Sequence, residues 1–515
     1  MVKKSRPQLA FVIMLMAAFT LGVGAVPEKT VYWGSVAEPD TLDPGQAWDN
    51  ASVFFTVNLF DNLVRLDPVT SKIVPSLAVS WQVRNNGILW EFELRKGVRF
   101  HDGTEFNADS VVFSFRRQMD KNFPHRFYDF PLFDEIFKNI VSVEAVNSHT
   151  VVFRLAEPFY PFLATLTSSP AAIVSPAAVK LYGKEFPRNP VGTGAFRFKS
   201  WDKDNRIVLE ANPQYWRGKP DFDYFCRITT DKFEKLHNLF REEQLDILDS
   251  YSISRTTGLR NLRWATIKMI PLLSVTFISF NLNNQFLNRE NVRKAIYHAW
   301  DPRFLKYVFQ DFVNPLMSII PKAMPGCKIE SRESKFDMKK ARSYMGKEKI
   351  NQPVRLTFLL VRDSVLERQL VSLFSKNLKR IGIELKIVVV SDEEFKRRVG
   401  KGDYDLSIYG WIADYPDPQS IISPLFNAQL RKNGFPNLSQ YRDSGIQSQI
   451  RNLSLETDTL KRTQIVNAIL TQIDERALCI PIYQNLSVII YNNRKIKSIQ
   501  VTPIDAIHLF DIEKK

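Results

Sequence analysis

Two short segments bring charged and aromatic side chains together just after predicted strands. One is Gly410-Trp411-Ile412-Ala413-Asp414-Tyr415, which follows a predicted strand over 404–409. The other is Arg362-Asp363-Ser364, which follows a predicted strand over 355–361. Because ligands of open α/β sheets bind outside the carboxyl ends of the strands, both segments are candidate ligand-binding loops.

The sequence lacks the residue patterns of the common catalytic sites. It contains neither a GxSxG nucleophile motif nor a Walker A phosphate-binding motif. No two of its six histidines have the i, i+4 spacing of a metalloprotease helix, and His, Cys and carboxylates form no evident metal-binding cluster. His101-Asp102 resembles a catalytic pair in isolation, but it lies in a predicted hairpin-to-helix turn, which favours a structural role. The sequence therefore predicts a protein that is not an enzyme and holds no metal or cofactor.

The candidate loops belong to a half of the chain in which strands and helices alternate. Apolar residues at helical spacing predict a helix over 292–300. Beyond it the pattern predicts strands over 355–361, 383–390 and 404–409, separated by helices over 366–381 and 392–399. This β-α-β-α-β order is typical of a parallel sheet covered by helices.

The first half of the chain is rich in hairpins instead. Apolar residues alternate on both sides of Asn85-Asn86-Gly87, whose residue types tolerate a tight turn with positive φ. Similar patterns predict hairpins over 141–155 and 196–209, and Asn107 is the predicted N-cap of a helix that follows the first hairpin. Two halves of different character indicate two lobes with a cleft between them.

The N-terminus has the pattern of an export signal. Basic residues precede an apolar run over 9–24, and Val23 and Ala25 are small residues at the −3 and −1 positions of a cut after Ala25. An uncleaved membrane anchor is the alternative, although the run is slightly shorter than the ~20 apolar residues of a spanning helix. No cysteine follows the run, so a lipid-modified N-terminus is not expected. A protein without either attachment is retained by an outer membrane, which favours the periplasm.

Cysteine usage and charge exclude several further classes. Cys226, Cys327 and Cys479 are far apart and form no CxxC pair, so a redox motif is not supported, and their disulfide state is left open. The formal charge is +15, but Lys and Arg are dispersed among acids and no run of five basic residues occurs. We therefore expect a generally basic surface and no nucleic-acid partner.

A series of motifs, spread in order over nearly all of the chain, is similar to one family: the periplasmic solute-binding proteins of peptide and nickel ABC importers, extracellular solute-binding family 5. Each motif is weak alone, and together they are specific. They are Glu38-Pro39-Asp40-Thr41-Leu42-Asp43-Pro44, Asn58-Leu59-Phe60-Asp61, Pro75-Ser76-Leu77-Ala78, Leu94-Arg95-Lys96-Gly97-Val98-Arg99-Phe100-His101-Asp102-Gly103-Thr104, Gly192-Thr193-Gly194, Asn212-Pro213-Gln214-Tyr215-Trp216, Val292-Arg293-Lys294-Ala295-Ile296, Gly402-Asp403-Tyr404-Asp405 and Asp414-Tyr415-Pro416-Asp417-Pro418.

The resemblance implies an α/β, two-lobed periplasmic-binding-protein fold, type II-like and of cluster C, with a small inserted domain. Hinges are expected near Pro271 and Pro481. The implied division is a signal peptide at 1–25, a first lobe from 26–47, 190–271 and 481–515, an inserted domain at 48–189, and a second lobe at 272–480. The implied function is capture of short peptides in the interlobe cleft by a monomer, for import by the membrane permease and ATPase subunits of an ABC importer.

The resemblance also implies roles for residues of the two candidate loops. Asp414 matches the Asp that meets the α-amino group of peptides in family members, although an Asp there can also cap the following loop. Arg362 is the nearest match to the Arg that holds the ligand carboxylate in dipeptide binders, and a solvated loop charge is equally compatible. Trp411 would stack on the ligand or fill the core of the lobe.

Residues beside the Gly-Trp pair are part of the same expected site. Gly410 and Tyr409 would lie next to the ligand, whereas Ile408 stands where some oligopeptide binders carry a basic residue. That departure weakens the case for carboxylate recognition of longer peptides. The alternatives left open are a binder of a metal chelate (nickel or heme), a binder of a modified peptide such as glutathione, and a structural or adhesive role.

Overall fold

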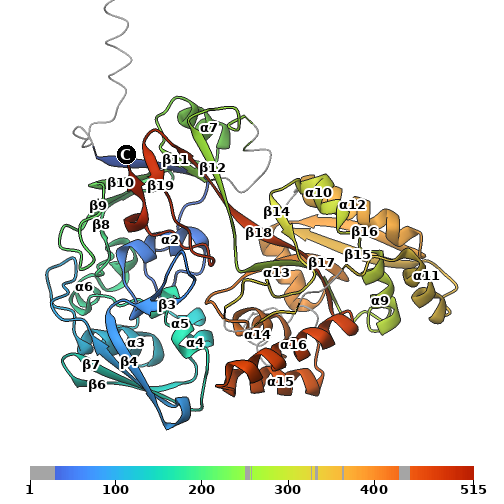
Figure 1. Cartoon of the computed structure of the whole chain (residues 1–515), viewed down its shortest axis with the longest axis horizontal. Coiled ribbons are helices and arrows are strands. Elements are labelled where there is room, and N and C mark those ends of the chain that lie inside the picture. Colours follow the sequence, from blue (N-terminus) through green and yellow to red (C-terminus); the bar gives the residue numbers. More distant parts are fainter. Residues whose placement is uncertain are drawn as a thin grey trace, which may run out of the picture.

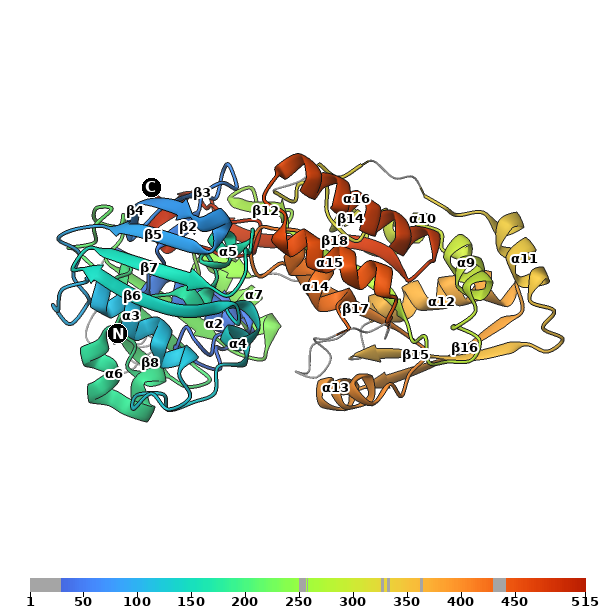
Figure 2. The same ribbon diagram turned by 90° about the horizontal axis from the view of Figure 1, so that it is seen from below.

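The computed structural model of the chain describes residues 29–249, 256, 258–325, 328–330, 334–361, 365–428 and 441–515. The predicted signal peptide, Cys327 and the candidate loop Arg362-Asp363-Ser364 lie outside the described residues. The described chain forms two lobes (Figure 1), and the view from below places the second lobe at one end of an elongated molecule (Figure 2). Among the described helices, none combines the length and the apolar composition that a membrane span requires.

One large sheet runs through both lobes, and its longest strand, β18 (Cys479–Asn492), belongs to both. In the second lobe β18 pairs antiparallel with β13 (Ser274–Phe280) and β14 (Val313–Pro315). In the first lobe it pairs with β12 (Ala265–Pro271) and β11 (Ile247–Asp249). The main path of the sheet is β16-β15-β17-β13-β18-β11-β1-β10-β9-β8. The two lobes are therefore connected by sheet hydrogen bonding as well as by the chain.

Strand β18 passes from the second lobe to the first near Leu486, which pairs with Pro271. The sequence predicts this crossover near Pro481, but Pro481 pairs with Phe277 inside the second lobe. A register shift at Thr276 accommodates the proline, which has no backbone N–H to give to the ladder. The exact limits predicted for the parts of the chain stay predictions.

The β-α-β-α-β order predicted for the second lobe is confirmed, because β15 pairs in parallel with both β16 and β17. Side chains of β13 alternate between two buried cores, with Val275 and Phe277 in one and Ile278 and Phe280 in the other, so helices cover both faces of the sheet. The remaining elements of this lobe are α9 (Glu290–Ala299), α10 (Arg303–Phe309), α11 (Met338–Lys347), β15 (Val354–Val361), α12 (Val365–Lys379), β16 (Ile383–Val390), α13 (Asp392–Lys401), β17 (Leu406–Ile412), α14 (Gln419–Phe426), α15 (Ser444–Leu455) and α16 (Thr459–Glu475).

The first lobe is centred on β1, whose parallel neighbours are β10 and β11. The predicted hairpin over 196–209 is confirmed as β8 and β9. The C-terminal tail also packs in this lobe, since Asn58 donates to the Ile507 carbonyl over 2.9 Å and accepts from the Leu509 amide over 2.7 Å. The elements are β1 (Thr30–Ser35), α2 (Asn50–Leu59), β8 (Phe196–Asp202), β9 (Arg206–Ala211), β10 (Tyr224–Thr229), α7 (Phe233–Arg241), β19 (Ile496–Ser498), the 3-10 helix η6 (Leu509–Asp511) and β20 (Glu513–Lys514).

The inserted segment forms a four-stranded antiparallel sheet, in the order β4-β5-β7-β6, with a buried core of its own. Both predicted hairpins in it are confirmed, and Asn86 and Gly87 have the positive φ expected of the turn. Asn107 caps α3 by accepting a hydrogen bond from the Ser110 amide over 3.1 Å. The elements are β2 (Val64–Leu66), β3 (Ile73–Pro75), β4 (Ala78–Arg84), η2 (Asn85–Gly87), β5 (Leu89–Leu94), α3 (Ala108–Met119), α4 (Pro131–Ile136), β6 (Ile140–Asn147), β7 (Thr150–Leu155), α5 (Phe162–Thr165), η3 (Ser169–Ala171), α6 (Pro176–Tyr182) and η4 (Gly183–Arg188).

Candidate functional site

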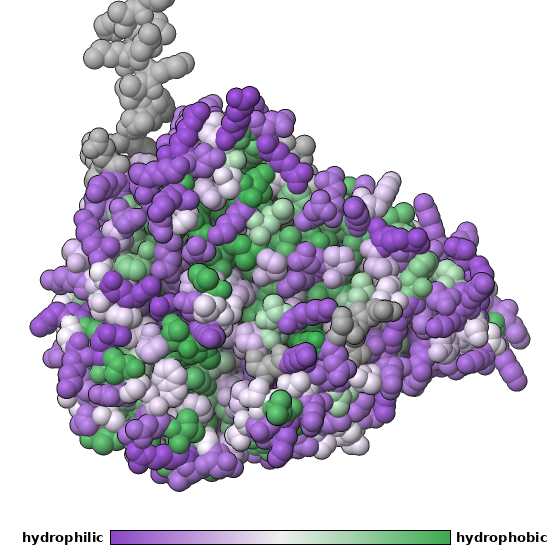
Figure 3. Space-filling model, viewed as in Figure 1, coloured by the Kyte–Doolittle hydropathy of each residue, from purple (hydrophilic) through white to green (hydrophobic). Residues whose placement is uncertain are grey.

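A cavity of about 610 Å³ lies where the second lobe meets the first lobe and the inserted segment. The second lobe contributes residues 409–414 and Lys396 to its wall, and the rest comes from stretches within 47–76, 132–217 and the tail over 502–508. The space-filling view shows apolar side chains gathered along the junction of the lobes (Figure 3). A volume of this size falls within the ~300–1,000 Å³ of typical small-molecule sites.

Asp414 lies on the second-lobe wall of the cavity, two residues beyond the end of β17. The chain is fixed up to that point, because Ile412 pairs with Ser274 and the Ala413 amide donates to the Leu273 carbonyl over 2.8 Å. Burial raises the pKa of the Asp414 carboxyl from 3.8 to about 7, and a hydrogen bond from its own backbone amide opposes this rise only in part. Among the described residues no basic side chain pairs with it. A ligand cation would therefore stabilise its charged form.

Asp417, a second acid of the same loop, is engaged by protein groups instead. Arg462 donates to its two carboxylate oxygens over 2.9 and 2.8 Å, and the Gln419 amide donates to it over 2.8 Å. The Arg462 guanidinium also lies over the ring of Tyr160 in the inserted domain, 3.9 Å from the ring centroid. Asp417 thus performs the loop capping that the sequence leaves open for Asp414.

Strand β17 continues beyond its predicted end at Tyr409, through Ile412. The prediction of a loop from Gly410 onward is wrong, because the segment pairs with β13 as far as Ser274. The reason is tertiary: the partner strand holds the backbone extended where the glycine alone suggests a break. The carboxyl end of the strand still meets the cavity, as the parallel-sheet argument predicts.

Tyr409, Gly410 and Trp411 all line the cavity. The Tyr409 ring stacks on Phe395 with centroids 6.3 Å apart, and burial raises the pKa of its phenol to about 12, which keeps it neutral. Gly410 is exposed. The Trp411 indole donates to the Ser420 carbonyl over 2.8 Å and packs against the core of the lobe. Trp411 therefore packs in the core of the lobe and also lines the cavity, and its stacking on a ligand stays a prediction.

The wall opposite the second lobe, which the first lobe and the inserted segment form together, carries basic residues that the sequence does not single out. Arg217 pairs with Asp511 at 3.1 Å and lies over the Phe510 ring, 4.4 Å from its centroid. Arg65, on the short strand β2, lines the same cavity. His508 is also part of the wall, and burial lowers the pKa of its imidazole, which keeps it neutral near pH 7. No local pattern distinguishes Arg65 from an ordinary arginine of a strand, and only the tertiary structure brings it to the site.

The lobes also touch each other outside the loop that carries Asp414. Lys396 of α13 lies over the ring of Trp48, 5.0 Å from its centroid, and Trp48 precedes α2 of the first lobe. In the inserted domain, the Tyr160 amide donates to the Ser454 carbonyl at the end of α15 over 3.0 Å. The cavity is thus bounded by parts of the chain that are already in contact.

The described histidine and cysteine side chains that could in principle act in catalysis or redox chemistry lie in environments typical of structural residues. The described His, Cys and acidic residues include no group of three that could hold a metal ion. Cys226 and Cys479 are buried free thiols, and burial raises the pKa of Cys226 to about 11. The two ring nitrogens of His101 bind the backbone of Gly194 over 3.0 Å and of Gly192 over 3.4 Å, and burial lowers its pKa to about 4.

Fold and cavity define a two-lobed binding protein, and comparison with known families identifies its class. The family model of the bacterial extracellular solute-binding proteins, family 5, matches residues 72–433. The chain belongs to this family, whose members are non-catalytic solute-binding components of ABC importers. It is 30% identical over 478 residues to the probable D,D-dipeptide-binding periplasmic protein of Escherichia coli K12, with 89% of each chain covered. It is 26% identical over 488 residues to the dipeptide-binding protein of the same organism, covering 89% of this chain and 88% of that protein.

Solved structures show the same architecture. A periplasmic binding protein from Helicobacter pylori in complex with the peptide STSA superposes with a TM-score of 0.82 at 26% identity, covering 94% of this chain and 98% of that one. A dipeptide-binding protein from Pseudoalteromonas in complex with Met-Leu shares the fold, with a TM-score of 0.82 at 23% identity and coverage of 94% and 100%. The α/β, two-lobed fold predicted from the sequence is confirmed.

Proposed function

We propose that this chain captures short peptides in the cavity between its lobes and delivers them to the permease and ATPase subunits of an ABC importer. The observation that carries the proposal is Asp414, a partly buried carboxylate without a described counter-ion that lines a cavity of about 610 Å³. A peptide α-ammonium is the cation that suits this position, and a charge-assisted hydrogen bond would form between the two. The relatives named for dipeptides support the same assignment.

Several further predictions belong to this proposal. The chain would act as a monomer in the periplasm, after cleavage behind Ala25 and without a lipid anchor. Arg362 remains a proposed partner of the ligand carboxylate, and Trp411, Tyr409 and Gly410 remain proposed ligand contacts. We expect no nucleic acid, metal or cofactor to take part.

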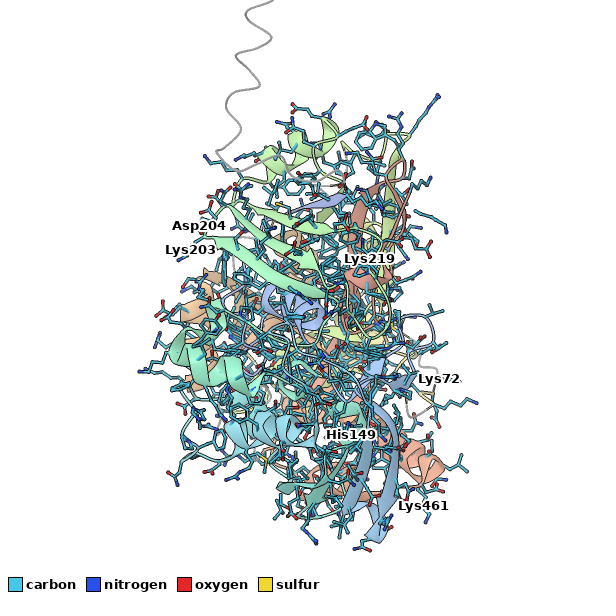
Figure 4. All side chains as sticks on the ribbon, turned by 90° about the vertical axis from the view of Figure 1, so that its left-hand side faces the viewer. Lys72, His149, Lys203, Asp204, Lys219 and Lys461 are labelled. Atoms are coloured by element: carbon cyan, nitrogen blue, oxygen red, sulfur yellow. The ribbon has the colours of Figure 1, made fainter. Side chains whose placement is uncertain are left out.

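The test combines ligand identification with one substitution. Mass spectrometry of solute that co-purifies with the native protein should find peptides with free N-termini. Calorimetry with those peptides should show strong loss of binding in Asp414→Asn and none in the matched control Asp204→Asn. Asp204 is an exposed carboxylate in the turn between β8 and β9, is labelled at the edge of the molecule in Figure 4, and is not part of the cavity wall. Recovery of a nickel chelate, heme or an N-blocked solute instead, with no peptide bound by the wild-type protein, would contradict the proposal.

A further inference from the structure

Arg65 is a cavity-lining cation without a described partner. It lies in the middle of β2, between the buried Val64 and Leu66, and its side chain is half-buried. Its Nε–H is buried and donates to no described atom, and no ion pair or ring contact of Arg65 occurs in the described part of the chain. A buried N–H group of an arginine normally has a hydrogen-bonding partner, because leaving a buried polar group unpaired is costly.

The charged groups around Arg65 are already committed to other partners. Asp511 binds Arg217 at 3.1 Å. Asp67 accepts hydrogen bonds from the amide of Thr70 over 2.8 Å and of Val69 over 3.2 Å, which close the turn after β2. The nearby acids therefore partly offset the positive charge of Arg65, but none of them forms a hydrogen bond or an ion pair with its guanidinium.

Asp61, a third acid near this wall, is equally occupied. The phenol of Tyr215 donates to Asp61 over 2.9 Å, and the Trp216 indole and the Thr193 hydroxyl donate to the other oxygen of Asp61 over 3.0 and 2.8 Å. Burial and the neighbouring Arg217 lower the pKa of Arg65, and Asp511, Tyr215 and Asp67 oppose this shift only in part. The guanidinium fork remains available for two parallel hydrogen bonds to a carboxylate.

We propose that Arg65 binds a carboxylate of the captured solute. This inference rests on the proposed function, in which the solute is a peptide. The carboxylate is the C-terminal group of a short peptide or an acidic side chain, since the two present the same fork to an arginine. Asp414 takes the ammonium from the second lobe, and Arg65 takes the carboxylate from the strand that leads into the inserted domain.

This arrangement differs from the one that the sequence predicts, in which Asp414 and Arg362 both come from the second lobe. A solute held by Asp414 and Arg65 spans the two sides of the cavity. Both charged ends of the solute can then be bound at once only when the two walls of the cavity are close together. The bound solute therefore favours the closed arrangement of the lobes. Recognition of both charges and closure would be one event.

The test uses Arg65→Gln, Arg65→Lys and the matched control Arg154→Gln, whose arginine is exposed on β7 and away from the cavity. The probes are Ser-Thr-Ser-Ala, its C-terminal amide, and the amide of Ser-Thr-Asp-Ala, each measured by calorimetry. We expect Arg65→Gln to lose at least about 30-fold in affinity for the free-acid peptide, because one partner of a desolvated charge pair is removed. Arg65→Lys should lose less, since it keeps the charge but not the fork. Arg154→Gln should match the wild type.

Each outcome bears on the inference. If amidation weakens binding to the wild type but hardly to Arg65→Gln, the C-terminal carboxylate is the partner. If the aspartate-containing amide binds the wild type well and Arg65→Gln poorly, an acidic side chain is the partner. If folded Arg65→Gln, checked by its melting temperature, binds all three probes like the wild type, the inference is wrong while the proposed function stands. A wild-type protein that binds none of the three, and with which no peptide co-purifies, refutes the proposed function itself.

Discussion

The pH dependence of peptide binding follows from the surroundings of Asp414. Burial raises the pKa of this carboxyl to about 7 in the ligand-free protein, and a bound ammonium would lower it again by favouring the charged form. Below pH 7 the binding of an ammonium must therefore expel a proton. With a free-state pKa of about 7, protonation of Asp414 alone should lower affinity roughly tenfold from pH 8 to pH 6 and about 90-fold from pH 8 to pH 5.

The upper limb of the profile comes from the peptide. Its α-amino group loses its proton with a pKa of about 7.7–8.0, so affinity should pass through a maximum slightly above pH 7. Tyr409, on the same wall, stays neutral over this window because its pKa is raised to about 12. Burial lowers the pKa of His508, which favours its neutral form.

The assay is calorimetry at half-unit steps from pH 5 to pH 8.5, with a peptide that co-purifies and with its N-acetylated form. Asp414→Asn should bind the free peptide weakly and with a flat lower limb. Acetylation should weaken binding to the wild type by a similar factor and matter little to Asp414→Asn, because both changes break one interaction. A wild-type profile that is flat from pH 5 to pH 7, or the same slope in Asp414→Asn, would refute the assignment.

The same shift makes a separate prediction about stability. The folded protein holds the Asp414 proton up to about pH 7, whereas the unfolded chain releases it near 3.8, so this group destabilises the ligand-free fold increasingly as pH rises through that window. A shift of three units corresponds to at most about 4 kcal/mol. At pH 8, ligand-free Asp414→Asn should thus melt above the wild type, and saturating peptide should reverse the order. An unchanged melting temperature would contradict the account of burial.

Four more predictions follow from the fold. Arg462→Ala leaves Asp417 buried and unpaired and should destabilise the protein by about 3–5 kcal/mol in urea unfolding, whereas a loss below 1 kcal/mol would show a solvated pair. His101 has a pKa lowered to about 4, so the unfolded chain protonates first; stability should drop between pH 6.5 and pH 4, and less so in His101→Asn. Mass spectrometry of the exported protein should show cleavage after Ala25, and salt-resistant full-length chain in the membrane pellet would indicate an anchor instead. Saturating peptide should reduce or preserve the radius of gyration in small-angle scattering, and an increase would contradict closure.

The sequence predicts local structure well where the signal is local. The turn at Asn85-Asn86-Gly87 and the cap at Asn107 follow from residue types that favour those conformations, and both are confirmed. The parallel order of the second lobe follows from periodicity. The end of β17 at Ile412 could not be predicted in the same way, because the strand that holds it lies more than a hundred residues earlier.

The candidate site shows the same division. The motif around Asp414 is visible in the sequence, but it offers two acids, and only Arg462 reveals that Asp417 is the structural one. The residues next to Arg65 in the sequence do not indicate a binding role, because that role depends on which partners the neighbouring acids bind in the folded protein. Residue types therefore indicate that the second lobe can bind a cation. The residues of the opposite cavity wall could not be predicted, because contacts between segments distant in the sequence bring them together.

Strand β18 and the tail behind it also determine when the first lobe can assemble. Strand β1 belongs to the first residues of the described chain, yet its neighbour β11 lies beside β18, and Asn58 is held by the backbone of Ile507 and Leu509. A nascent chain lacking its last thirty or so residues would have β11 without that neighbour, an open edge that favours aggregation. Contacts of such sequence separation form slowly. We expect the first lobe to stay unfolded until synthesis is complete, a delay that suits the periplasmic location of the family.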